Sequence, residues 1–188
     1  MATPDPAGLA ALSDLGSATP RLCRRRLPAY RHLPGLTPHP TADPRGHSYG
    51  RAEEPGSVPP PEDWPACEAY LFGCDLYNRG YWWEAHEAWE GPWQGCRARP
   101  AQHRFLQGLI QAANAQLKLA LGRPQAVGRL WEKAEAHFEA AAAGRRFMGL
   151  ALPDWRGATA HYLAARLAET PLRHDPAAYP LLRMHHCA

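Results

Sequence analysis

The chain has 188 residues, enough for one domain with a buried core and too few for two large domains. Apolar residues make up 45% of it and charged residues 21%, as in soluble proteins, but 20 prolines and 16 glycines exclude a chain that is helical throughout. The formal net charge of +3 excludes a chain that binds nucleic acid along its whole length, so no nucleic-acid partner is expected.

The cysteines and the apolar runs indicate in which cellular compartment the protein is expected. Five cysteines are an odd number, and no Cys-x-x-Cys pair occurs among them, so neither a disulfide framework nor a four-thiolate zinc site is indicated. Apolar runs near the start, such as residues 9–12, are too short for a membrane span or a signal-peptide core. We therefore expect a cytoplasmic protein with no membrane partner.

Residues 1–61 are predicted to form an irregular, proline-rich N-terminal arm. Thirteen of the 20 prolines lie in the first 65 residues, and no helical spacing of apolar residues is found among them. The aromatic and histidine side chains of residues 30–49 are not typical of a disordered linker. We expect this part of the arm to lie extended against the surface of the domain.

From Pro61 onward the apolar residues follow helical spacing, and no alternating strand pattern appears. The sequence therefore predicts an all-α domain over residues 62–170, a compact antiparallel bundle of about five helices, followed by a tail at 171–188. The five helices are expected from Pro61 to Tyr77, from about Tyr81 to Trp93, from Pro100 to Gly122, from Pro124 to about Gly144, and from Pro153 to a point before Pro171.

A weak internal repeat supports this fold. Gly80 and Trp89 recur 42 residues later as Gly122 and Trp131. The run at residues 76–85 looks like the turn of a tetratricopeptide (TPR) hairpin, in which glycine permits the tight turn. Two copies are too few for a solenoid, so we expect a compact bundle built from TPR-like hairpins.

The second predicted helix places one histidine among three tryptophans. On a helical wheel, His86 shares a narrow sector with Trp82, Trp89 and Trp93. Burial of this tryptophan face would bury much of the imidazole, which then needs a hydrogen-bond partner. Glu90, one turn further along the helix, can accept its N–H.

The third predicted helix has one polar sector on an otherwise apolar or small circumference. Three uncharged amides, Gln107, Gln111 and Asn114, lie in this sector between His103 and Lys118. Amides both donate and accept hydrogen bonds, so they suit an imidazole and a carboxylate on a facing helix. We expect Gln107 and Gln111 to approach the His86, Glu87 and Glu90 side chains.

Three interpretations of this polar cluster stay open. The first is a binding module whose pocket, covered by the arm, holds a small polar ligand or a side chain of a protein partner. The second is a metal-assisted hydrolase with a divalent metal on His86 and Glu90 and with Glu87 as general base. The third is a purely structural network that determines how two helices dock.

Metal binding would need further ligands. The spacing of His86 and Glu90 resembles that of zinc proteases with the second histidine replaced by glutamate. His39 and His47 could supply the missing ligands if the arm folds over the second helix. Alternatively, these two histidines form hydrogen bonds within the turns of the arm itself.

Two motifs, YNRGYWWEAHEAWEGPW at residues 77–93 and FLQGLIQAA at residues 105–113, resemble the signature of the family called "domain of unknown function 309". The resemblance covers about residues 65–145 and implies a small all-helical fold without an established activity. Its signature falls on Asn78, Gly80, Tyr81, Glu84, His86, Glu87, Trp89, Glu90, Trp93, Gln107, Gly108 and Gln111. The resemblance thereby adds Asn78 and Glu84 to the candidate polar site.

Overall fold

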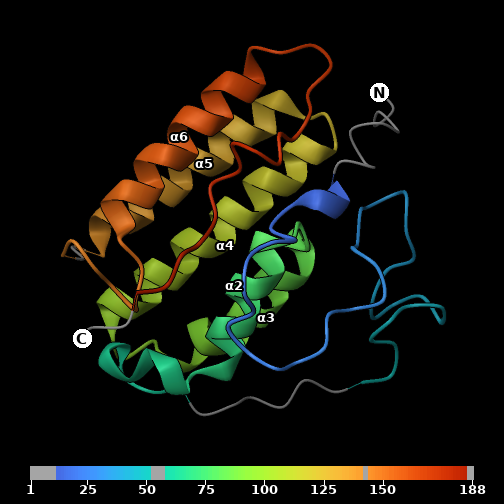
Figure 1. The fold of residues 1–188 in the computed structure, drawn as a ribbon. Helices are drawn as coiled ribbons and strands as arrows, with labels where there is room; N and C mark the ends of the chain where they lie inside the picture. Colours follow the sequence, from blue (N-terminus) through green and yellow to red (C-terminus); the bar gives the residue numbers. More distant parts are fainter. Residues whose placement is uncertain (1–11, 52–57, 142–143, 186–188) are drawn as a thin grey trace.

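The computed structural model describes residues 12–51, 58–141 and 144–185. Within these ranges the protein is all-α, with five α-helices and no β-strand, so the expected helical bundle is confirmed (Figure 1). The helices are α2 (Glu68–Asn78), α3 (Trp82–Gly95), α4 (Pro100–Ala120), α5 (Pro124–Ala140) and α6 (Leu152–Leu167), and two 3-10 helices are η1 (Leu12–Asp14) and η2 (Pro61–Ala66). None of these helices is both long and apolar enough to cross a membrane.

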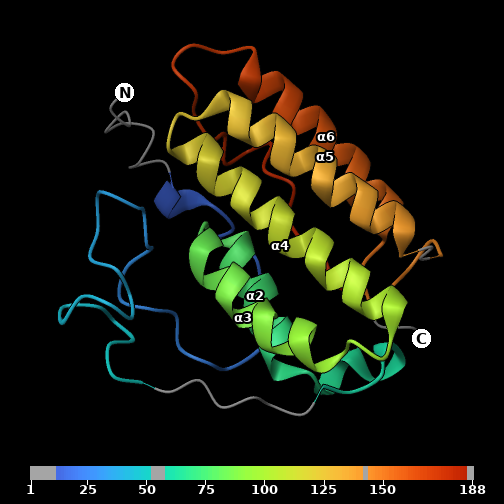
Figure 2. The ribbon, with the colours of Figure 1, turned by 180° about the vertical axis from the view of Figure 1, so that it is seen from behind.

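Helix α4 lies at the centre of the bundle. The α2–α3 hairpin packs on one side of it and α5 on the other, while α6 lies alongside α5 (Figures 1 and 2). Gly108 lets α5 come close, because a Cβ there would lie 2.4 Å from the ring of Phe138. The buried residues of α4 are apolar or small except for Gln102 and Gln116, and its other polar side chains are half-buried or exposed.

The two hairpin turns are alike. Gly80 ends the α2–α3 turn with φ of +75°, and Gly122 ends the α4–α5 turn with φ of +65°. Both values lie in the left-handed region that glycine adopts without steric cost. The residues that follow at matching positions, Ala85 and Val127, are both fully buried. The repeat in the sequence therefore corresponds to a repeated turn geometry.

The first predicted helix is divided into two elements. The spacing from Pro61 to Tyr77 predicts one continuous helix, but the structure has η2 followed by α2, with Cys67 between them in a non-helical conformation. Pro65 lies inside η2 and has no N–H to donate, which is unfavourable in the interior of one continuous helix from Pro61.

The first described part of the arm, up to Cys23, lies against α2 and is held there by a buried carboxylate (Figure 1). Asp75 is completely buried and accepts the backbone N–H groups of Leu22, at 3.0 Å, and Cys23, at 3.1 Å. The Arg21 guanidinium lies 2.8 Å from the same carboxylate. The arm therefore supplies the partners that a buried negative charge requires. Parts of the predicted arm and tail, residues 1–11, 52–57 and 186–188, lie outside the described residues.

The segment after α6 crosses back over the bundle, and the buried imidazole of His174 anchors it there. His174 lies 2.8 Å from the Tyr162 hydroxyl and 3.1 Å from the carbonyl oxygen of Gln116, and its ring stacks on Trp82 with the centroids 4.4 Å apart. Burial lowers the pKa of His174 to about 3. The folded protein thus holds this imidazole in its neutral form.

This burial predicts a loss of stability in acid. In the unfolded chain His174 takes up a proton near its usual pKa of about 6.5, whereas the folded chain resists protonation down to about pH 3. The free energy of unfolding should therefore fall as the pH drops through this window, by up to about 1.4 kcal/mol per pH unit from this group. Urea unfolding between pH 7 and pH 4.5 measures the slope.

The slope should be smaller in His174→Gln, which cannot titrate, whatever its absolute stability. His161→Gln, at an exposed position on α6, is the matched control and should keep the wild-type slope. Equal slopes in all three proteins would contradict the assignment to His174.

Candidate functional site

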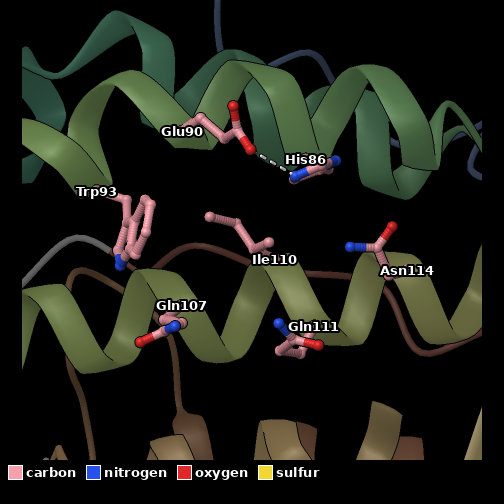
Figure 3. A pocket seen from close by; sticks show the side chains of 7 residues that line it. All are labelled: His86, Glu90, Trp93, Gln107, Ile110, Gln111 and Asn114. Carbon is pink, nitrogen blue, oxygen red and sulfur yellow. Dashed lines mark hydrogen bonds and ion pairs between the residues drawn. The ribbon is translucent and has the colours of Figure 1, made fainter.

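A pocket of about 180 Å³ lies between α3 and α4, and Figure 3 shows its lining. Helix α3 contributes a histidine, a glutamate and a tryptophan, and α4 contributes three amides and one isoleucine. The lining residues are His86, Glu90, Trp93, Gln107, Ile110, Gln111 and Asn114. The structure thus brings together, in one pocket, five of the eight residues that sequence analysis assigns to the polar site, and Glu87 lies beside it next to His86.

The imidazole of His86 lies between two carboxylates. Its Nε2 is 2.8 Å from Oε1 of Glu90, one helical turn away, and its Nδ1 is 3.6 Å from Oε1 of Glu87. The His86 side chain is 21% exposed, so it sits at the surface of the bundle and is open to solvent through the pocket. Trp82 and Trp89, by contrast, point into the core and are buried.

The amides of α4 have unused hydrogen-bonding capacity. Within the described chain, Gln107, Gln111 and Asn114 make no side-chain hydrogen bond, and all three are half-buried. None of them bonds to His86 or Glu90 across the pocket. The indole N–H of Trp93, which also borders the pocket, is buried without an acceptor (Figure 3). The walls therefore present both donors and acceptors to whatever enters the pocket.

The donor set of His86, Glu87 and Glu90 is compatible with a metal ion. One ligand atom from each of the three residues can be chosen so that all lie within 4.8 Å of one another, and no other such group of three occurs among the described residues. His39 and His47 do not belong to this group, so the structure does not bring the arm histidines to His86.

The arm histidines lie instead at the first turn of α3, around Glu84. This carboxylate is 5% exposed and accepts the backbone N–H of His32, at 2.7 Å, and Nε2 of His47, at 3.1 Å. Burial raises the pKa of Glu84, and these two bonds oppose the rise. His39 accepts the backbone N–H of Ala42 at 3.2 Å, as the alternative interpretation of the arm expects. Glu84 thus joins the arm to α3.

The helix geometry explains this separation. Glu84 and His86 are two residues apart, which is about 200° around an α-helix, so their side chains leave α3 on opposite sides. The arm covers the side of Glu84, and the pocket lies on the side of His86. Asn78 has a third environment: its side chain exchanges two hydrogen bonds with the backbone of Leu182, at 2.7 and 2.9 Å, and holds the tail.

Sequence analysis missed Asp75 and His174 as buried polar groups. A signal for Asp75 exists, because it is the single charged residue in the apolar run from Leu71 to Tyr77, and a charge in such a run must find partners. No comparable signal marks His174, since its partners Tyr162 and Gln116 are far away in the sequence.

Residues 70–130 match the family model described as Domain of unknown function (DUF309), which confirms the resemblance in its motifs. The match runs from α2 into α5 and contains every residue that lines the pocket between α3 and α4. No curated protein and no solved structure matches the chain.

The separate environments of Glu84 and Asn78 predict two separable effects. Glu84→Ala removes the acceptor for His32 and His47, at a cost of about 1–3 kcal/mol. Amide hydrogen exchange should then increase in residues 30–48 and not in 176–185. Asn78→Ala should produce the opposite pattern. Glu62→Ala, at an exposed carboxylate in η2, should change neither segment. If both variants loosened both segments equally, the arm and tail would not be held independently.

Proposed function

We propose that this DUF309 domain is a binding module whose pocket between α3 and α4 takes a small polar ligand. One observation carries the proposal: the side-chain amides of Gln107, Gln111 and Asn114 line one pocket without protein partners in the described chain, and Trp93 beside them has a buried N–H without an acceptor. In this proposal residues 62–170 form the domain that carries the pocket, with residues 1–61 as its arm and 171–188 as its tail.

The alternative, a purely structural network, is less consistent with the geometry. A network that docks two helices would use hydrogen bonds between them, as Asn78 and Asp75 do for the tail and the arm. Within the described residues, the amides of α4 form no such bond to the polar side chains of α3. Half-exposed amides are solvated in the free protein, so a ligand with hydroxyl or amide groups can replace that water at little cost.

The pocket should discriminate polar compounds in a binding screen. We expect ligand-detected NMR with a library of small hydroxyl- and amide-bearing compounds to find binders for the wild-type protein. Gln111→Leu should weaken these binders at least about tenfold, the effect of losing one or two good hydrogen bonds. Gln125→Leu, at an exposed glutamine on α5, is the matched control and should leave them unchanged. The proposal would be overturned if the screen found no binders, or if the binders had the same affinity for the Gln111→Leu variant as for the wild type.

A divalent metal on α3 is the second candidate, and with it a metal-assisted hydrolase. Two observations favour it: the clustered donor atoms of His86, Glu87 and Glu90, and the buried Nδ1 of His86, which has no hydrogen-bond partner. One imidazole and two carboxylates are a donor set that zinc and manganese accept. For the hydrolase, His86 and Glu90 alone would be the protein ligands, and Glu87 would act as the neighbouring general base in place of a third ligand.

Elemental analysis together with calorimetric titration of Zn²⁺ and Mn²⁺ tests this candidate. A metal site predicts stoichiometric binding that His86→Ala abolishes and that Glu90→Gln weakens at least about tenfold, because each removes a donor atom. Glu132→Gln, at an exposed carboxylate on α5, should bind like the wild type. Absence of stoichiometric metal, or equal binding by all variants, would exclude the metal site and leave the polar-ligand proposal standing.

A further inference from the structure

Cationic and imidazole side chains gather where the start of α4 meets the end of α5. Nη1 of Arg104, on α4, lies 3.4 Å from Nδ1 of His137, on α5. His103 precedes Arg104 on α4, while Lys133 lies one turn before His137 on α5. Arg97 lies in the connection that leads from α3 to α4. We call these five residues the basic cluster.

The groups of the basic cluster act on one another electrostatically. The pKa of His103 is lowered by burial and then by the charges of Arg104 and Arg97. The pKa of His137 is lowered by burial and then by Arg104, His103 and Lys133. No carboxylate contributes to either shift. Burial, and after it nearby positive charge, therefore holds both imidazoles toward the neutral form.

The arginines and the lysine of the basic cluster also lack salt bridges to the part of the chain that the structure describes. Within the described residues, Arg97, Arg104 and Lys133 pair with no carboxylate, whereas Arg156 pairs with Glu135 at 2.9 Å. Arg156 also lies 3.4 Å from Glu139, so both of these α5 carboxylates are engaged on the side of α6. Neighbouring cations without a carboxylate partner favour the binding of an anion, and a guanidinium beside an imidazole suits phosphate oxygens.

The basic cluster is continuous with the pocket. The ring of His103 stacks on the Trp93 indole, with centroids 5.0 Å apart and an angle of 26° between the planes. Trp93 and Gln107 form one end of the pocket, and His103 lies one turn before Gln107 on α4 (Figure 3). The Glu90 carboxylate bonds to His86, on the side away from Trp93 (Figure 3). An anionic group beside His103 would thus avoid this carboxylate.

We propose that the basic cluster binds a phosphate group, and that the ligand of the pocket is a phosphorylated small molecule whose polar body lies between α3 and α4. The second half rests on the proposed function, and the first does not. Arg104 is the central residue, because it contacts His137 and its charge acts on His103. Its guanidinium would donate to the phosphate oxygens, and His103 and His137 would become better donors as the anion raises their proton affinity.

Titration of inorganic phosphate, followed through the imidazole NMR signals, tests the basic cluster alone. We expect saturable shifts of His103 and His137 in the millimolar range and a rise in the pKa of both rings. Arg104→Gln should weaken phosphate binding at least fivefold. The matched control Arg129→Gln, at an exposed arginine on α5, should change it less than twofold. Equal weakening by both variants, or the same shifts with sodium chloride at matched ionic strength, would overturn the proposal.

Paired compounds test the identity of the ligand. Among binders of the pocket, the phosphate ester should bind at least about tenfold more tightly than its unphosphorylated parent, and Arg104→Gln should remove this difference. Equal binding of ester and parent would overturn the phosphorylated ligand while leaving the pocket intact. Gln111→Leu should leave inorganic phosphate binding unchanged, so failure of the pocket and failure of the basic cluster are distinguishable.

Discussion

The packing of Trp89 against Gly73 fixes how α2 and α3 lie together, and the pocket depends on that arrangement. A Cβ at Gly73 would lie 2.2 Å from Nε1 of Trp89, so only glycine leaves room for the indole. The same nitrogen donates to the carbonyl oxygen of Tyr70 at 3.1 Å. Because this contact is completely buried, it sets the rotation of α3 about its own axis.

That rotation gives each polar side chain of α3 a different environment. Glu84 is directed to the arm, where two N–H donors meet it, and Glu90 is directed to the pocket beside His86. A carboxylate that is enclosed needs partners from the protein, whereas one at an open pocket can keep water or exchange it for a ligand. One helix thus anchors the chain on one side and presents a chemically available surface on the other.

The sequence predicts the pocket well because the pocket consists of two helical faces. Helical spacing alone brings His86 and Glu90 opposite Gln107 and Gln111, and it needs no knowledge of distant contacts. The destination of the arm could not be predicted in this way. Its residues have no period, so nothing local indicates that His47 lies at Glu84. The tail has no such period either, so the sequence does not indicate that Asn78, which we predicted in the polar site, binds the backbone of Leu182 instead.

The hydrogen bonds of Asp75, Asn78 and Glu84 have a consequence for where the folding unit ends. All three side chains lie within the segment that matches the family, yet each has partners outside it, in the arm or in the tail. A fragment cut at residues 70 and 130 would retain every residue that lines the pocket, but Asp75, Glu84 and Asn78 would lose the partners that the arm and the tail supply. In this protein the unit that folds stably is therefore longer than the segment that matches the family.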